Sequence, residues 1–175
     1  MGHRAPSVEA TYLAAVLAAG EGAALTGRAG AHLWALVKGS APSPVVITTT
    51  ERRIEGVGTI RSRKLAPAEV TIFKAIPVTT VPRTLVELAA ELPETDLARA
   101  CHEAGVRYGT TPSAVAAVLE RRPTSRGAQK LRRIIAGEVH VTLSKLEARF
   151  LKLLRAQRLP LPITNRPAGA RRVDS

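Results

Sequence analysis

The pattern of apolar and polar positions predicts two helices at the amino-terminal end of the chain. Residues 7–19 and 27–37 carry apolar side chains at three- and four-residue spacing, and Ser7 stands where a helix N-cap belongs. Two helices around a glycine-rich turn also fit the outline of a helix-turn-helix. The second helix, however, offers a DNA groove only Arg28 and His32, whereas a recognition helix needs three or four base-contacting side chains, so this signal is weak.

Runs of β-branched residues next predict a small sheet. Residues 45–50 form the clearest strand, residues 59–64 alternate apolar and basic side chains, and residues 70–80 read as a further extended run. The connections between these runs are short and contain no predicted helix, so we expect antiparallel pairing. The sequence therefore predicts a mostly antiparallel sheet of at least three strands.

The remainder of the chain is predicted to be helical up to residue 157. Pro82 disfavours helix before it and suits a first helical turn, while Thr80 is placed as the cap and Arg83 as a structural anchor at the helix start. Helices are predicted at residues 82–92, 96–107, 112–121, 126–135 and 143–157. These elements define an α/β protein of the α+β type, in which amino-terminal helices pack on the sheet and a helical half follows.

Basic charge is concentrated in the last third of the chain. The net charge is +12, and residues 121–175 hold 14 Lys and Arg against 3 Asp and Glu. This asymmetry indicates a polyanion or an acidic protein surface as the partner, and a solvated helix face is the alternative explanation. We expect one domain over residues 1–137, and a basic helix with a Pro- and Gly-containing arm over residues 138–175.

The composition argues against several classes of chemistry. Five aromatic residues are too few for a stacking platform that holds single-stranded nucleic acid, and no apolar run has the length of a membrane span. A lone Cys101 forms no internal disulfide and suits a cytoplasmic protein. The four histidines, His3, His32, His102 and His140, lack metal-ligand spacing, and no phosphate-binding loop is found. We expect no enzyme, no cofactor, no metal and no membrane partner.

A set of short motifs carries a resemblance to a known family. In order they are Leu25-Thr26, Leu33-Trp34-Ala35-Leu36, Arg61-Ser62-Arg63, Glu69-Val70-Thr71, Ile76-Pro77-Val78-Thr79-Thr80, Arg83-Thr84-Leu85 and Leu88-Ala89. Over residues 8–137 they resemble the central domain of the AbiEi family of antitoxins, and the block that holds Pro77, Thr80, Pro82 and Arg83 is its most specific part. The resemblance implies an antitoxin for a nucleotidyltransferase-like toxin. We expect no winged helix before this domain, which puts autonomous promoter binding in doubt.

The carboxy-terminal segment carries a second resemblance. Its residues are Leu143-Ser144-Lys145-Leu146-Glu147-Ala148-Arg149-Phe150-Leu151, Leu159-Pro160, Asn165 and Val173-Asp174. They are similar to the opening of a very-short-patch-repair-like endonuclease domain, in which Glu147 and Asp174 match two metal-site carboxylates. Two carboxylates without further ligands do not secure a catalytic metal ion, so we expect a remnant of that domain in which Glu147 pairs with Arg171 or Arg172. A metal-dependent nuclease is the alternative.

Helix geometry selects the residues expected to bind the toxin. At about 100° per residue, four basic side chains of the helix at residues 143–157 share one arc opposite its leucines: Lys145, Arg149, Lys152 and Arg155. We expect this arc to be the first contact, and Arg61 and Arg63 on the sheet to be the second. The alternative function is a nucleic-acid-binding transcriptional regulator, with operator DNA as the partner of the basic helices. A dimer and an uneven antitoxin:toxin stoichiometry both stay open.

Overall fold

The computed structural model describes residues 6–62, 65–139, 154 and 156–157. The chain divides into two compact units, Met1–Val139 and His140–Ser175. Most of the helix predicted at residues 143–157 lies outside the described residues, as does the arm that follows it. The predicted domain boundary at residue 137 stays a prediction, and the architecture below is that of the first unit.

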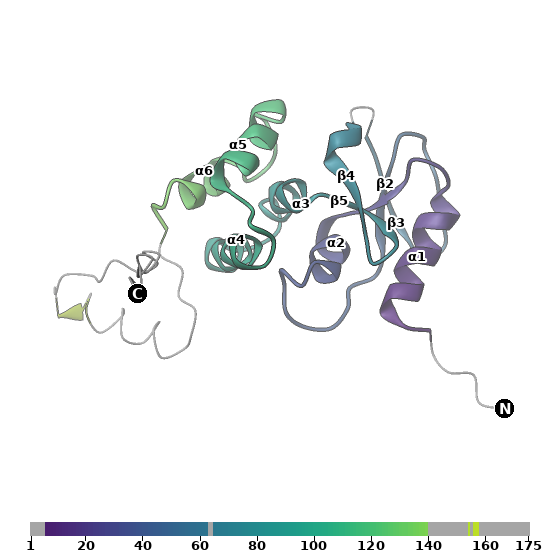
Figure 1. Cartoon of the computed structure of the whole chain (residues 1–175), viewed down its shortest axis with the longest axis horizontal. Helices are drawn as coiled ribbons and strands as arrows, with labels where there is room; N and C mark the ends of the chain where they lie inside the picture. The colour runs from purple at the N-terminus through teal and green to yellow at the C-terminus, as the bar shows by residue number, and fades with distance from the viewer. Residues whose placement is uncertain (1–5, 63–64, 140–153, 155, 158–175) are drawn as a thin grey trace, which may run out of the picture. The chain divides into compact units, whose positions relative to one another are not determined.

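A five-stranded mixed sheet forms the amino-terminal half of this unit, which confirms the predicted α+β class (Figure 1). The strands are β1 (Ala24–Leu25), β2 (Val45–Thr48), β3 (Gly58–Arg61), β4 (Val70–Phe73) and β5 (Ile76–Thr79), in the spatial order β3-β2-β1-β5-β4. Strand β1 pairs antiparallel with β2 and parallel with β5, and β4 pairs antiparallel with β5. Two central strands, β1 and β5, are therefore parallel.

The predicted antiparallel pairing of residues 45–50 with residues 59–64 was wrong. The two strands are neighbours, but they run parallel, with Val45 opposite Gly58 and Thr48 opposite Arg61. The connecting residues 49–57 reach about 30 Å when extended, whereas a four-residue strand spans about 13 Å. The loop is thus long enough to return along β2 before β3 begins, and the sheet is mixed instead of mostly antiparallel.

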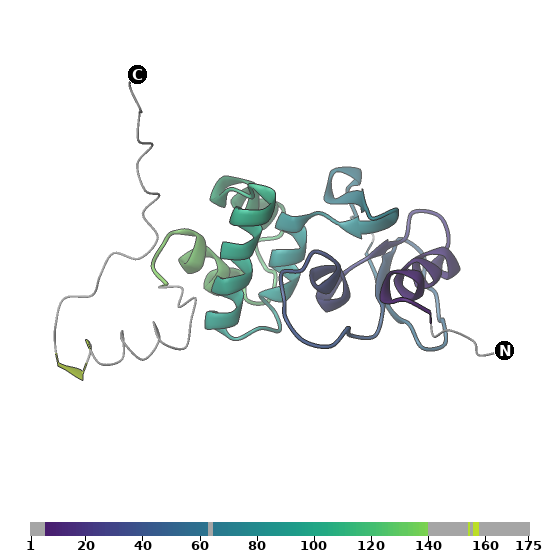
Figure 2. The same cartoon turned by 60° about the horizontal axis from the view of Figure 1, so that its bottom comes forward.

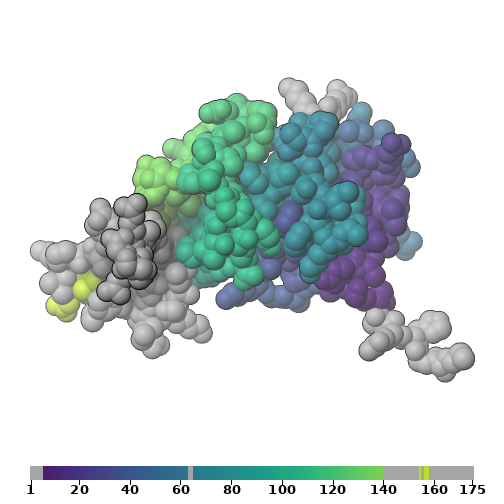
Figure 3. Space-filling model, in the orientation of Figure 1, coloured from purple at the N-terminus to yellow at the C-terminus, as the bar shows by residue number. Residues whose placement is uncertain are grey.

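Strands β4 and β5 form a tight hairpin within the extended run predicted at residues 70–80. Lys74 and Ala75 connect them with φ angles of 49° and 62°, the two positive values of a type I′ turn. Lys74 also donates from Nζ to Glu9 Oε1 at 2.9 Å, which ties the hairpin to the first helix. On the face shown in Figure 3, the hairpin region lies between the first helix and the helical half.

Helices α1 (Val8–Ala19) and α2 (Gly27–Leu33) form where the sequence predicted helices. The Ser7 side chain accepts a hydrogen bond from the Ala10 amide at 3.1 Å, which confirms Ser7 as the N-cap. Strand β1 lies between α1 and α2 and joins the sheet, so these residues form a helix–strand–helix unit and not a helix-turn-helix. The sequence pattern missed β1 entirely.

Helix α2 ends four residues before the predicted position because a Schellman motif closes it. The Leu36 amide donates to the Ala31 carbonyl and the Ala35 amide donates to the His32 carbonyl, both at 2.9 Å. Ala35 occupies the left-handed position of this motif, with a φ of 53°. The motif turns residues 35–38 away from the helix axis.

The helical half contains four helices in the predicted order: α3 (Val81–Leu88), α4 (Glu94–Tyr108), α5 (Pro112–Arg121) and α6 (Ala128–Ile135). A short 3-10 helix, η1 (Pro67–Glu69), precedes β4. Helix α3 contacts α2, α4 and α5, so it joins the sheet half to the helical half (Figures 1 and 2). Its buried residues Leu85 and Leu88 belong to a core that also holds Leu97 and Leu131. The four predicted helices are confirmed, with ends shifted by a few residues.

Candidate functional site

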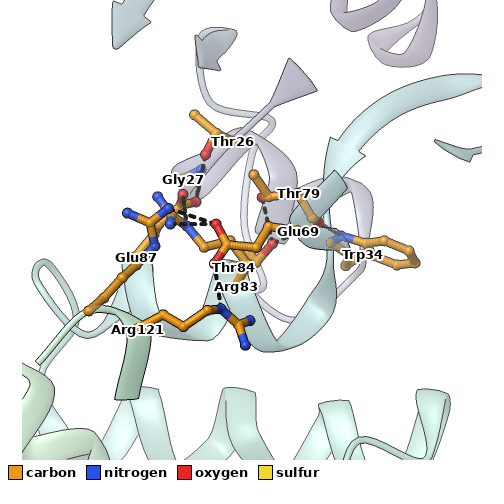
Figure 4. Close-up of polar contacts among 10 residues, drawn as sticks. Thr26, Gly27, Trp34, Glu69, Thr79, Arg83, Thr84, Glu87 and Arg121 are labelled. Atoms are coloured by element: carbon orange, nitrogen blue, oxygen red, sulfur yellow. Dashed lines mark hydrogen bonds and ion pairs between the residues drawn. The ribbon is translucent and has the colours of Figure 1, made fainter. Parts of the chain in front are cut away.

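The most specific sequence block forms the junction between β5 and α3 (Figure 4). Pro77 lies in β5, Thr80 occupies the N-cap position of α3, and Pro82 lies in the first turn. Thr80 makes no side-chain capping bond; instead the Thr84 hydroxyl donates to the Thr79 carbonyl at 3.1 Å and lies 2.9 Å from the Thr79 hydroxyl. The junction is therefore closed by two buried threonines, one at the end of β5 and one in the first half of α3.

Arg83 lies buried between two carboxylates. Only 8% of its side chain is exposed, and it donates from Nε to Glu87 Oε1 at 2.8 Å and from Nη1 to Glu69 Oε2 at 3.0 Å. A buried guanidinium is costly unless it is paired and hydrogen-bonded, and these two carboxylates supply both conditions. The contacts agree with the structural role expected for Arg83. Its partner Glu69 belongs to the Glu69-Val70-Thr71 motif, whereas Glu87 lies outside the motifs of the resemblance.

Glu69 joins the end of η1 to the end of α5. Its side chain is 2% exposed, and besides Arg83 it accepts from Arg122 Nη2 at 2.7 Å and from Arg121 Nε at 3.4 Å. Three guanidinium groups therefore converge on one carboxylate. The Glu69 carbonyl also accepts from the Thr80 amide at 2.9 Å, so the same residue fixes the start of α3.

Glu87 caps α2 from a different helix. Its Oε2 accepts from the Thr26 hydroxyl at 2.6 Å and from the Gly27 amide at 2.9 Å, and Gly27 is the first residue of α2. A carboxylate at this position satisfies an unpaired helix amide and interacts favourably with the positive end of the helix dipole. Thr26 thus needs no side-chain capping bond of its own, and α2 is held against α3.

Three aromatic side chains hold the other end of α2. Trp34 donates from Nε1 to the Thr79 carbonyl at 2.9 Å and stacks on Phe73 with ring centroids 4.3 Å apart. The Tyr108 hydroxyl donates to the Trp34 carbonyl at 2.6 Å, which joins the end of α4 to the end of α2. Both ends of α2 are consequently fixed, and the buried residues Thr79, Arg83 and Thr84 of the specific block are used inside the fold.

The surface next to this framework carries a groove between α2 with its following loop and α4. The α2–α4 groove has a volume of about 320 Å³. Its lining residues are Arg28, Ala35, Leu36, Val37, Lys38, Leu92, Asp96, Arg99, Glu103 and Arg107. Buried Leu36 and Leu92 give it an apolar base, and charged side chains surround that base.

The charges of the α2–α4 groove are unevenly paired. On α4, Arg99 lies 3.3 Å from Asp96 and Arg107 donates from Nε to Glu103 Oε2 at 2.7 Å. The hydrogen bond from Arg107 lowers the pKa of the Glu103 carboxyl, to which the charges of Arg107, His102 and Lys38 add. Arg28 and Lys38 are exposed, and neither forms an ion pair with any residue that the structure describes. The groove therefore holds two cations in excess.

The sequence predicted a different set of binding residues. Arg61 ends the edge strand β3, where its half-exposed side chain lies 3.8 Å from Glu51, and it does not line the α2–α4 groove. Arg63 and the four residues of the predicted cationic arc, Lys145, Arg149, Lys152 and Arg155, lie outside the described residues, as do Glu147 and Asp174. Toxin binding by all of these residues stays a prediction.

The groove was not predicted from the sequence, although one of its walls has a recognisable sequence pattern. Charges of alternating sign lie along one face of the α4 helix, because they are spaced by three, four and four residues. They belong to Asp96, Arg99, Glu103 and Arg107. Arg28 and Lys38 lie on other elements, and no spacing rule relates them to α4. The excess cations are thus visible only in three dimensions.

Other candidate chemistry finds little support among the described residues. Burial raises the pKa of the Cys101 thiol to about 12, so this thiol is a poor nucleophile at neutral pH. Within residues 6–62 and 65–139, no group of three His, Cys, Asp or Glu side chains is arranged to hold a metal ion. None of the helices in the described part of the chain combines the length and hydropathy that crossing a bilayer requires.

Comparisons with known proteins found no relative of this chain. It matches no protein-family model, no curated protein and no solved structure.

Proposed function

We propose that this protein is an antitoxin that neutralises a nucleotidyltransferase-like toxin by direct binding. The resemblance to the AbiEi central domain over residues 8–137 supports this proposal. Its most specific residues, among them Thr79, Arg83 and Thr84, lie together in one buried junction. Matches that jointly build a single structural feature are less readily produced by chance than matches scattered over a surface.

The observation that carries the proposal is the mixed charge of the α2–α4 groove. A surface that follows a nucleic-acid backbone neutralises successive phosphates with cations. In this groove the carboxylates of Asp96 and Glu103 pair with the α4 arginines, so the α4 wall offers phosphates no net positive charge. Protein interfaces combine an apolar centre with charged groups of both signs at the rim, and the groove has this composition.

A basic antitoxin suits the chemistry of such a toxin. A nucleotidyltransferase needs clustered carboxylates that hold metal ions, and it needs an open surface for nucleic acid. A partner with a net charge of +12 is attracted towards carboxylates, which accelerates encounter at low salt. Binding beside the catalytic carboxylates would cover the face that the nucleic-acid substrate needs.

Co-expression with the product of the neighbouring gene tests the proposal. We expect the two proteins to co-elute in size-exclusion chromatography at moderate salt, and we expect the antitoxin to restore growth of cells that express the toxin. Rescue without a complex would indicate an action on toxin expression or on the toxin's target. Absence of both rescue and complex would reject the antitoxin function.

The predicted cationic arc is tested separately from the function itself. The change of Arg149 and Lys152 to Glu reverses two charges of the arc, and it should weaken neutralisation while the protein stays folded. Circular dichroism of the variant checks the fold. Unchanged neutralisation would reject the arc as a toxin contact without affecting the antitoxin proposal.

A nucleic-acid-binding regulator is a second candidate because of the cations around α6. Arg126 precedes this helix and Arg132 lies on it; both are exposed, and neither forms an ion pair with another described residue. Binding through phosphates predicts sequence-independent affinity that falls steeply with salt, with a log–log slope of about −0.9 per phosphate neutralised. A salt titration of duplex DNA binding by fluorescence anisotropy measures this slope, and salt-insensitive or absent binding would reject the candidate.

A further inference from the structure

We propose that the α2–α4 groove is the surface on which the protein partner docks, and that it receives an acidic segment whose carboxylates pair with Arg28 and Lys38. This inference rests on the proposed antitoxin function and names the contact through which it acts. It assigns the contact to residues that the sequence analysis did not select.

The two walls of the groove differ in the net charge that remains after the ion pairs within each wall are counted. The α4 wall is neutral, because Asp96 pairs with Arg99 and Glu103 pairs with Arg107. The opposite wall carries Arg28 on the first turn of α2 and Lys38 in the loop after it. Charge complementarity therefore calls for a ligand with two negative charges on the α2 side.

The apolar base of the groove makes such a pairing stronger than one on an open surface. Leu36 and Leu92 are 4% and 6% exposed, and they line the groove together with the partly exposed Val37. A segment that covers these side chains excludes water from the adjacent ion pairs, and charges interact more strongly when water is excluded. An acidic segment with one or two apolar side chains fits this arrangement best.

Hydrogen bonds within the fold hold both walls of the groove without a partner. Glu87 holds the amino end of α2, the Schellman motif fixes the loop that carries Lys38, and the Tyr108 hydroxyl joins α4 to the Trp34 carbonyl. A preformed site loses little conformational entropy when it binds, so more of the contact energy appears as affinity. These bonds set the separation of the two walls.

A nucleic-acid ligand suits this groove less well. Its neutral α4 wall offers no excess cation to a phosphate, and the two excess cations lie on the single opposite wall. A nucleic acid that places only two phosphates on these cations would gain little affinity at physiological salt, since nonspecific binding requires several neutralised phosphates. We therefore assign the groove to a protein segment.

The test compares two double variants of the full chain that change charge equally. In the first, Arg28→Glu and Lys38→Glu reverse the excess cations of the groove. In the control, Arg52→Glu and Arg53→Glu reverse two exposed arginines outside the groove lining that form no ion pairs with described residues. Affinity for the purified toxin is measured by isothermal titration calorimetry at moderate salt.

We expect the groove variant to bind the toxin about 10- to 100-fold more weakly, and the control to change affinity by about twofold or less. An Arg28→Ala and Lys38→Ala variant should lie between the two, and thermal melting verifies that each variant is folded. Reversal of an acidic pair in the toxin to Lys should restore binding of the groove variant.

Four outcomes would overturn the inference. Equal losses in both double variants would show a general charge effect, and unchanged binding of the groove variant would place the contact elsewhere while the antitoxin function stands. Loss of DNA binding in the groove variant, with toxin binding intact, would assign the groove to nucleic acid. If the wild-type chain forms no complex with the toxin, the proposed function fails first and the inference falls with it.

Discussion

The buried junction at Arg83 and the α2–α4 groove are built from the same kinds of side chain, and they differ in how the charges are matched. At the junction, Glu69 and Glu87 surround a guanidinium from which water is excluded, and every one of these groups has a partner (Figure 4). In the groove, arginines and carboxylates remain accessible, and Arg28 and Lys38 are in excess. Matched and buried charges hold elements together, whereas accessible and unmatched charges remain for a partner.

The largest expected effect separates these two roles directly. Glu69→Gln removes the charge on which three arginines converge, and the buried Arg83 keeps Glu87 as its remaining carboxylate partner. We therefore expect a loss of about 3 kcal/mol in the free energy of unfolding, the lower end of what breaking a buried ion pair costs. Urea denaturation measures it. Glu103→Gln removes a carboxylate from an exposed pair and should cost far less. Similar losses at both positions would contradict the distinction.

A smaller effect is expected at the other carboxylate of the junction. Glu87→Gln removes the negative charge at the start of α2 and weakens two hydrogen bonds, while the buried Arg83 keeps its ion pair with Glu69. We therefore expect a loss of about 1–2 kcal/mol in the free energy of unfolding. Thr26→Ser keeps the hydroxyl donor and should change stability little, whereas Thr26→Val should reproduce part of the Glu87 effect. If both Thr26 variants behave alike, the hydroxyl contact is not important.

A substitution in the groove wall is expected to raise the free energy of unfolding, whereas the substitutions at the junction lower it. Ala35 has a φ of 53°, which glycine adopts without the steric cost of a Cβ, so Ala35→Gly should stabilise the protein by about 0.5–1 kcal/mol. Ala136 also ends a helix, but with a φ of −74°, and Ala136→Gly should destabilise it by a similar amount. Thermal denaturation of both variants provides the comparison. Destabilisation by Ala35→Gly would show that Ala35 does not have the positive φ angle of a left-handed residue in solution.

The smallest effect concerns pH. Because Arg107 lowers the pKa of folded Glu103 below its ordinary value of 4.5, this ion pair stabilises the fold above that value, and its contribution is lost as the pH falls through the folded pKa. Titration by NMR should show the Glu103 pKa rising towards 4.5 in an Arg107→Gln variant. An unchanged pKa would mean that Arg107 does not hold the carboxylate in solution.

Much of the fold was predictable because local patterns determine it. Helical spacing and the punctuation by proline and glycine located α3 to α6, and Ser7 caps α1 as expected. The two-residue strand β1 is too short for any pattern, and it becomes a strand only through its neighbours β2 and β5. The parallel direction of β3 depends on the path of a loop, which loop length limits but does not determine.

The charged sites were less predictable because their members lie far apart in the sequence. The structural role of Arg83 was expected, but its partner Glu69 lies 14 positions earlier and the other two arginines lie 52 and 53 positions after that carboxylate. In the groove, only the α4 residues have a spacing that sequence reasoning can use. Ion pairs between different elements depend on the tertiary fold, so the sequence pattern did not reveal which charged residues pair.

The long span of the Glu69 contacts has a consequence for the lifetime of the folded state. Bonds between residues this far apart require the intervening chain to be in place, so we expect them to form after the transition state for folding. Interactions that form late slow unfolding more than they accelerate folding. Glu69 would thus slow unfolding. It would lower the rate at which the sheet half and the helical half separate, and with it the rate at which a protease can cleave the unfolded chain.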